Sequence, residues 1–231
     1  MLTSWDKLPN SMRIPEVRPY YDYLYRKRTM LFFKRLFDLI VAALLLVLLA
    51  LPMLIIAVWI KTDSDGPIFY RQERVTRDGK RFRIHKFRTM VANADQIGTA
   101  VTVDKDKRIT KVGERLRSLR LDELPQVLDV LSGNMSFVGT RPEAVKYVKQ
   151  YKPEYFATLL LPAGITSEAS IRYKNENELL NAADDVDRVY LEKVLPDKME
   201  WNLAEIKRLS LLRELGTMFR TVAAVCGKNF D

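Results

Sequence analysis

The chain has 231 residues, a formal net charge of +9, one cysteine and one histidine, and 48% of its residues are hydrophobic. This length allows one globular domain of ordinary size together with a membrane element, and the composition supports a sizeable core. A single cysteine excludes an internal disulfide and a multi-cysteine metal site, and a reducing, cytosolic setting is the simplest fit. A single histidine leaves little material for a His-rich zinc site or a Ser-His-Asp triad. Any metal is therefore expected to be a hard cation held by oxygen ligands.

Residues 1–30 are predicted to form an irregular N-terminal extension, because three prolines interrupt them. Four tyrosines between positions 20 and 25 precede a basic run. Aromatic residues interleaved with Arg and Lys are typical of a membrane interface. A solvated leader without a role is an equally open interpretation.

The most apolar stretch runs from Leu39 to Ile60. About 20 apolar residues are enough to cross the hydrocarbon core of a bilayer. The run begins too late and is too long for a cleaved signal peptide, and a core helix of a soluble protein usually has a shorter apolar run. We therefore expect this segment to lie in a membrane.

The orientation of this segment is open on the residues alone. Lys and Arg flank both ends, and positive charge favours the cytoplasmic side. A single span would leave one basic cluster outside, whereas a helix that bends at Pro52 and returns would keep both inside. Proline kinks a helix and removes a backbone donor, but kinked spans are also common.

After a turn at residues 62–67, two strand-like runs at 68–75 and 81–87 flank an Asp-Gly turn, which predicts a β-hairpin. The strands carry many cations, which form either a solvated face or a face directed at phosphate. From Ile109 the apolar spacing turns helical, and a second helix is predicted at 126–131, ended by Ser132 and Gly133. Residues 201–225 have the spacing of one or two amphipathic helices, which either lie on the membrane or pack on the core.

Asp122 and Glu123 are the most suggestive carboxylates. The chain has no Walker-type or Gly-rich dinucleotide loop, so a nucleotide would have to be held by cations, helix N-termini or a metal. An Asp N-cap followed by a Glu in the first turn is also an ordinary helix start. Neighbouring helical residues point roughly 100° apart, so one carboxylate could attack a substrate while the other holds a metal.

Arginines surround this pair in the sequence. A guanidinium group binds phosphate oxygens in a bidentate fork, although a solvated basic helix face would look the same. The arginines concerned are Arg108, Arg115, Arg117, Arg120 and Arg141.

A series of short motifs resembles the bacterial sugar transferase family, the monotopic phosphoglycosyl transferases that start the assembly of surface glycans. The motifs are Lys34–Asp38, Gly66–Arg74, Lys86–Met90, Arg108–Gly113, Leu121–Gln126 and Met135–Gly139. The resemblance runs in order from about Lys34 to Glu178. Because no further transmembrane helices precede the apolar segment, the chain is similar to the small type.

The resemblance implies a helix-rich α+β fold. It implies a compact cytosolic catalytic domain (residues 62–231) on a re-entrant membrane helix (residues 31–61) that is broken near Pro52. Residues 1–30 would be an N-terminal extension, and the C-terminal helices would be amphipathic and interfacial. The expected location is the bacterial inner (cytoplasmic) membrane, with the catalytic domain on the cytosolic face.

The resemblance also implies an activity. A sugar-1-phosphate would pass from a UDP-sugar to polyprenyl (undecaprenyl) phosphate, giving polyprenyl diphosphate sugar and UMP. The expected partners are these two substrates and the membrane, without nucleic acid, and downstream glycosyltransferases are allowed.

The family motifs imply roles for individual residues. Asp122 would be the covalent nucleophile, and Glu123 would be catalytic as a ligand of Mg²⁺. The residues expected to bind substrate are Lys86, Arg88, Arg120, Arg141 and Pro142.

Three departures from the family pattern are visible. Thr140 replaces the first proline of a Pro-Arg-Pro motif, Leu51 replaces a serine that often precedes the break proline, and Asn134 replaces an aspartate. The first two predict a looser turn before Arg141 and a looser helix break. The donor sugar and the glycan pathway stay open.

A rival interpretation is a non-catalytic, membrane-anchored basic scaffold that binds anionic lipid or a partner glycosyltransferase. Such a scaffold would keep the apolar segment and the cations, but it would have no use for two adjacent carboxylates. A nucleic-acid binder is a more distant alternative, because the chain shows no motif for it; its affinity would fall steeply with salt.

Overall fold

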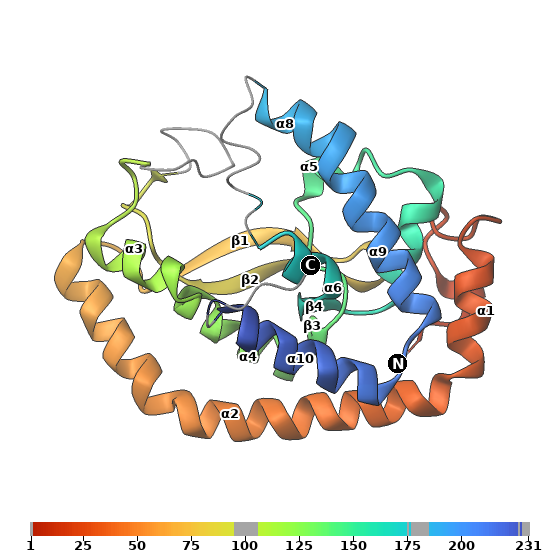
Figure 1. The fold of residues 1–231 in the computed structure, drawn as a ribbon, viewed down its shortest axis with the longest axis horizontal. Helices are drawn as coiled ribbons and strands as arrows, with labels where there is room; N and C mark the ends of the chain where they lie inside the picture. Colours follow the sequence, from red (N-terminus) through yellow and green to blue (C-terminus); the bar gives the residue numbers. More distant parts are fainter. Residues whose placement is uncertain (1, 95–105, 175, 177–184, 226, 228–231) are drawn as a thin grey trace.

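The computed structural model describes residues 2–94, 106–174, 176, 185–225 and 227. Over these residues the protein has the predicted helix-rich α+β architecture (Figure 1). The helices are η1 (Trp5–Lys7), α1 (Arg18–Arg26), α2 (Arg28–Asp63), η2 (Arg77–Gly79), α3 (Lys111–Ser118), η4 (Leu121–Gln126), α4 (Val127–Leu131), α5 (Val145–Val148), η5 (Pro153–Leu160), α6 (Glu168–Arg172), α8 (Val186–Val189), η6 (Tyr190–Val194), α9 (Leu195–Lys207) and α10 (Leu211–Val225). Those marked η are 3₁₀ helices, except η6, which is a π-helix.

The strands form two small sheets. β1 (Phe69–Val75) and β2 (Arg81–Phe87) pair antiparallel, with Phe69 opposite Phe87. Asp78 and Gly79 both have positive φ at the turn between them, which confirms the hairpin predicted from the Asp-Gly pair. β3 (Met135–Val138) and β4 (Ala163–Thr166) pair in parallel.

Helix α2 lies along the lower edge of the molecule in Figure 1 and packs against it through one stripe. The stripe repeats every three or four residues, and its members are Leu31, Lys34, Asp38, Ala42, Leu45, Leu49, Met53, Ile56 and Ile60. Ala42 packs in a cluster with Val127 and Val130 of α4. Ile56 packs in a cluster with Val112 of α3. The helix is therefore held against the domain over most of its length.

Pro52 bends α2 and does not break it. The helix is continuous from Arg28 to Asp63, so the expected break near Pro52 is corrected to a bend. Pro52 is exposed on the outer side of the helix, where its ring crowds the carbonyl of Leu48 and removes one hydrogen bond. Opening the outer side curves α2 toward the domain, as Figure 1 shows, and packing on the inner side keeps the helix intact.

Both ends of α2 are tied to the same domain. Near its start, Lys34 Nζ donates to Glu214 of α10 at 2.7 Å and to the carbonyl of Val138 at 3.1 Å. At its end, the carboxylate of Asp63 accepts from the backbone N–H of Val112 at 3.2 Å.

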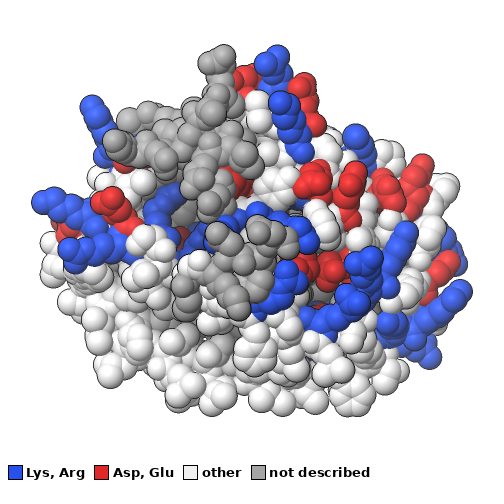
Figure 2. Space-filling model, viewed as in Figure 1, with Lys and Arg blue, Asp and Glu red and all other residues white. Residues whose placement is uncertain are grey.

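The outer face of α2 is apolar and exposed. Its exposed residues include Ile40, Leu44, Val47, Leu48, Leu51, Leu54, Ile55 and Val58. Figure 2 shows that the lower part of this view, over α2, carries no charged residues, while Lys, Arg, Asp and Glu gather above it. Among the described residues, α2 is the one helix long and apolar enough to cross a membrane.

The N-terminal segment belongs to the core, so the solvated-leader interpretation is wrong and the extension is not irregular throughout. Leu8, Met12, Val17 and Leu24 are at most 3% exposed and join one cluster with residues of η5 and α9. Helix α2 begins at Arg28, a few residues earlier than expected.

The two C-terminal helices differ in what covers them. α9 buries Leu195, Met199 and Leu203 in the main cluster, which makes it a core helix. α10 leaves Leu212 and Phe219 80% and 74% exposed. The amphipathic pattern therefore marks a packed helix in one case and a helix with an uncovered apolar face in the other.

Candidate active site

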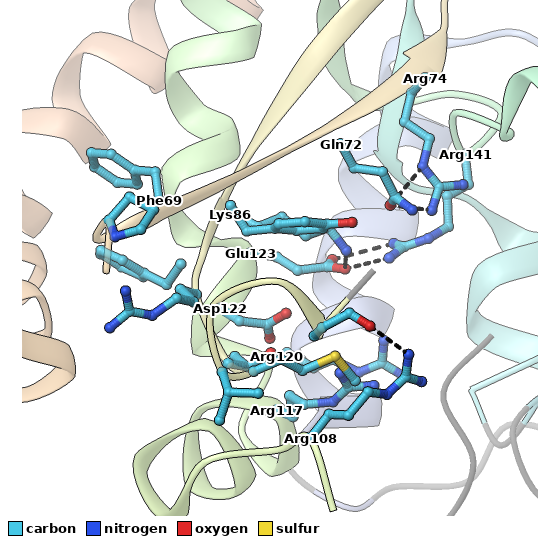
Figure 3. Close-up of a pocket in the computed structure, with 18 of the residues that line it drawn as sticks. Phe69, Gln72, Arg74, Lys86, Arg108, Arg117, Arg120, Asp122, Glu123 and Arg141 are labelled. Carbon is cyan, nitrogen blue, oxygen red and sulfur yellow. Dashed lines mark hydrogen bonds and ion pairs between the residues drawn. The ribbon is translucent and has the colours of Figure 1, made fainter. Parts of the chain in front are cut away.

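Asp122 and Glu123 lie in η4, the 3₁₀ turn that joins α3 to α4. The residue before this turn, Arg120, has φ 56° and ψ 21°, in the left-handed region. No side chain caps η4, so the interpretation of Asp122 as an ordinary N-cap is wrong. The left-handed Arg120 reverses the chain after α3 and directs the two carboxylates into the pocket shown in Figure 3.

Glu123 is held by two cations. Lys86 Nζ, from β2, donates to its Oε1 at 2.8 Å, and Arg141 donates to both of its carboxylate oxygens. Burial alone would raise the pKa of Glu123, but Arg141 and Lys86 outweigh it and hold that pKa well below its ordinary value. Glu123 is therefore a fixed negative charge.

Asp122 is in a different environment. Among the residues drawn in Figure 3, none donates a hydrogen bond to its carboxylate. Burial raises the pKa of Asp122, the charge of Glu123 acts in the same direction, and Lys86 and Arg117 oppose them. A carboxylate without bound donors and with a raised pKa is a better nucleophile than one held in ion pairs.

The two carboxylates sit in a pocket of about 530 Å³. Of the predicted site residues, Lys86, Arg88, Arg120, Asp122, Glu123 and Arg141 line it. Pro142 is buried and is not among the lining residues; its carbonyl accepts from Arg74 at 3.3 Å. Pro142 therefore supports the wall from behind.

Arg88, which lines the pocket, also binds the C-terminal end of α2. Its Nη2 donates to the carbonyl of Ser64 at 2.5 Å and to Ser64 Oγ at 3.0 Å, at the C-terminal end of α2. The last carbonyls of a helix lack partners within the helix, and Arg88 supplies one. The contact joins the residue after β2 to the end of α2.

The arginines near the carboxylates in sequence divide into two groups. Arg108, Arg117 and Arg120 line the pocket, and Figure 3 shows them gathered on the Asp122 side. Arg115 turns toward α2, with its guanidinium carbon 5.8 Å from the centre of the Trp59 ring. The pocket thus gathers positive charge around the free carboxylate.

The turn that contains Thr140, just before Arg141, is bonded to a neighbouring strand, and the looser turn expected from Thr140 stays a prediction. The carbonyl of Thr140 accepts from the backbone N–H of Gly164 at 2.8 Å. The bond ties this turn to β4 and so fixes the backbone from which Arg141 reaches Glu123.

Several lining residues were not predicted as site residues. They include Gln72, Arg74, Ser170, Tyr173, Glu176 and Lys198. Gln72 and Arg74 lie two residues apart on β1 and so share a face of the strand. The cations of the predicted hairpin indicated that such a face could be directed at phosphate. No sequence pattern indicated the residues from α6 onward, because helical spacing does not show which cavity the polar face of a helix will line.

The site offers a hard cation two carboxylates, Asp122 and Glu123. Among the described residues, no third His, Cys, Asp or Glu side chain joins Asp122 and Glu123 to make a metal cluster. Mg²⁺ commonly takes one or two carboxylates together with substrate phosphates. The donor set therefore fits a cation that arrives with a phosphorylated substrate, and Glu123 would have to exchange an ion pair to bind it.

Comparison with known proteins places the sequence in a family. The family model for bacterial sugar transferases matches residues 29–228. A UDP-glucose:undecaprenyl-phosphate glucose-1-phosphate transferase of Klebsiella pneumoniae is 38% identical over 194 residues, which are 82% of this chain and 39% of that protein. A UDP-N-acetylgalactosamine-undecaprenyl-phosphate N-acetylgalactosaminephosphotransferase of Aeromonas hydrophila is 35% identical over 197 residues, 84% of this chain and 44% of that protein.

A third relative is closer in length. It is a UDP-glucose:undecaprenyl-phosphate glucose-1-phosphate transferase of Caulobacter vibrioides, 36% identical over 195 residues, 83% of this chain and 69% of that protein. The chain spans about two fifths of the length of the first two relatives. The family match nevertheless covers most of the chain, and this protein belongs to the bacterial sugar transferase family.

Proposed function

We propose that this protein transfers a sugar-1-phosphate from a UDP-sugar to polyprenyl phosphate, giving polyprenyl diphosphate sugar and UMP. The observation that carries the proposal is the pair Asp122–Glu123, in which one carboxylate is unbound with a raised pKa and the other is held in two ion pairs. A diphosphate sugar needs a nucleophile beside cations that stabilise the leaving phosphate. The names of the family members quoted above support the same reaction.

The reaction is proposed to run in two steps. A carboxylate oxygen of Asp122 attacks the sugar-side phosphorus, a new oxygen–phosphorus bond forms, and the bond to the UMP oxygen breaks. The phosphate oxygen of the polyprenyl phosphate then attacks the same phosphorus and releases Asp122. Arg108, Arg117 and Arg120 are positioned to stabilise the negative charge that develops on the departing UMP.

Mg²⁺ is proposed as the cofactor, with Glu123 as its protein ligand. A bound divalent cation would neutralise the diphosphate and so favour departure of the nucleotide. Lys86 and Arg141, the present partners of Glu123, would then be released to contact phosphate oxygens.

The membrane arrangement is proposed to be re-entrant, with the domain on the cytosolic face of the bacterial inner membrane. Three features support it: both ends of α2 contact the same domain, its inner stripe is packed, and its outer face is apolar. A straight span would have to leave this packing. The exposed apolar face of α10 would rest in the same interface, where a lipid acceptor can meet a water-soluble donor. Later glycosyltransferases would act on the lipid-linked product.

Release of UMP tests the proposal. Detergent-solubilised protein is incubated with a panel of UDP-sugars, Mg²⁺ and polyprenyl phosphate, and UMP is measured. With the lipid omitted, the correct donor should release at most one equivalent of UMP and add the mass of one phosphosugar to a peptide containing Asp122. The Asp122→Asn variant should give neither, while Asp6→Asn, which removes an exposed carboxylate on η1, should behave as wild type. A membrane-bound scaffold without enzymatic activity would release no UMP with any donor.

A further inference from the structure

The pocket has a second wall, formed by residues that follow the Asp122–Glu123 turn in the chain. It is built by α6, by residues that follow α6 and by the first turn of α9, and its lining residues are Ser170, Tyr173, Lys174, Glu176 and Lys198. Neither helix carries a family motif used above. Arg120 reaches this wall through a 3.1 Å bond from its Nη2 to the carbonyl of Lys174, so the wall is continuous with the turn that presents the nucleophile.

Lys198 is the centre of this wall. Its side chain is only 6% exposed, and its Nζ lies 3.0 Å from Glu176 and 3.3 Å from the hydroxyl of Tyr190. Tyr190 in turn donates to Glu143 at 2.7 Å. Burial of a lysine is costly unless its charge is paired, and Lys198 is paired with Glu176 and Glu143 while its side chain lines the pocket.

The chemistry of the two walls differs. The wall around Asp122 combines Arg108 and Arg117 with the small apolar surface of Met90, Val91 and Ala94, a combination suited to a phosphate and a flat base. The α6–α9 wall combines two lysines, one carboxylate (Glu176) and the hydroxyls of Ser170 and Tyr173. The hydroxyl groups of a sugar are neutral and both donate and accept hydrogen bonds, so they match a surface of this mixed kind.

We propose that the α6–α9 wall is the sugar subsite, where Lys198 and Glu176 recognise hydroxyl or N-acetyl groups of the hexose. The inference rests on the proposed function, because attack by Asp122 at the sugar-side phosphorus separates the hexose from the nucleotide. The nucleotide then lies along the arginine wall. Discrimination between sugars that differ at one hydroxyl depends on such buried polar partners, which are left unpaired by the wrong sugar.

Binding measured without turnover tests the subsite. In an Asp122→Asn background, the Kd values of UMP, UDP-glucose, UDP-galactose, UDP-N-acetylglucosamine and UDP-N-acetylgalactosamine are determined by calorimetry for Glu176→Gln and Lys198→Gln. Both variants should weaken the preferred UDP-sugar about tenfold and change the order of preference, while the affinity for UMP stays the same. The matched controls are Glu192→Gln and Lys193→Gln, which remove the same charges at exposed neighbouring positions.

Glu176→Gln preserves the shape of the side chain. It therefore still tests the subsite if Lys198→Gln lowers the stability of the protein. Loss of UMP affinity with an unchanged order of sugars would assign this wall to uridine and overturn the proposal. Equal affinities in variants and controls would also overturn it. Failure of the proposed function would look different. Wild-type protein would release no UMP from any donor, while Glu176→Gln would still change the Kd values of the UDP-sugars relative to that of UMP.

Discussion

Lys86 and Glu123 form a shielded ion pair at 2.8 Å, with side chains 20% and 12% exposed. Arg141 shares the same carboxylate. Breaking a buried pair by removing one partner leaves an uncompensated charge, whereas removing both is often tolerated. The pair therefore has a structural role in addition to any part in binding a cation.

A double-mutant cycle should reveal this coupling. Glu123→Gln leaves Lys86 and Arg141 without their carboxylate, and we expect it to lower the free energy of unfolding by up to roughly 3–5 kcal/mol. Lys86→Met/Glu123→Gln should be less destabilised than the sum of the two single variants, with a coupling of about 0.5–3 kcal/mol. Urea unfolding in detergent micelles measures all four proteins, and additive values would show that the two side chains act independently.

The neighbours Asp122 and Glu123 should respond to pH with opposite signs. Because folding lowers the pKa of Glu123, its contribution to stability is present above its unfolded pKa of about 4.3 and is lost as the pH falls through the lower folded value. Folding raises the pKa of Asp122. The stability that the protonated Asp122 contributes is therefore fully present below its unfolded pKa of about 3.9, and it is lost as the pH rises through the pKa of the folded protein.

Asp122→Asn should therefore stabilise the protein at neutral pH while abolishing turnover. Each 1 kcal/mol gained would raise Tm by roughly 2–4 °C for a chain of this size. The difference from wild type should vanish toward acidic pH, where Asp122 is protonated. A lower Tm for Asp122→Asn at pH 7 would contradict the raised pKa, and the acid limb of the wild-type pH–rate profile, lying above the ordinary aspartate range, is an independent check.

Arg120 combines a strained backbone with a side chain in the pocket, and two substitutions separate these contributions. Arg120→Gly and Arg120→Ala both remove the guanidinium, but only glycine adopts a φ of 56° without a penalty of roughly 1–2 kcal/mol. We expect Arg120→Gly to be more stable than Arg120→Ala by about this amount, and both to lose a similar part of kcat/KM. Recovery of full activity in Arg120→Gly alone would show that the backbone conformation is what matters.

The sequence predicted the parts of this protein that depend on local chemistry. The hairpin follows from two strand-like runs about Asp78-Gly79, and the helix of α3 follows from apolar spacing after its cap, Thr110. Asp122 and Glu123 were singled out as adjacent carboxylates near a predicted helix start, and the family motifs in order around them implied their roles. Their different environments were not predictable, since Lys86 and Arg141 reach Glu123 from elements far apart in the chain.

The remaining differences arise from packing between distant segments. A proline predicts a lost hydrogen bond but not whether the helix breaks. The continuous inner stripe of α2, from Ala42 to Ile56, decides that it bends. Burial of Leu8 and Met12 against α9 could not be read from a proline-rich extension. Lys198 likewise enters the pocket because α9 packs beside α6, which helical spacing alone does not reveal.

The ends of α2 should both face the cytosol. Thr29 and Thr62 are exposed and lie near the two ends of the helix, each close to a contact with the same domain: Lys34–Glu214 at one end and Asp63–Val112 at the other. Cysteines placed at these positions in a Cys226→Ser background should both resist a membrane-impermeant thiol reagent applied to spheroplasts from outside, and both should react after permeabilisation. The reaction after permeabilisation is the control for accessibility. Labelling of one position in sealed spheroplasts would mean that α2 crosses the membrane, which would require its inner stripe to leave α3 or α4.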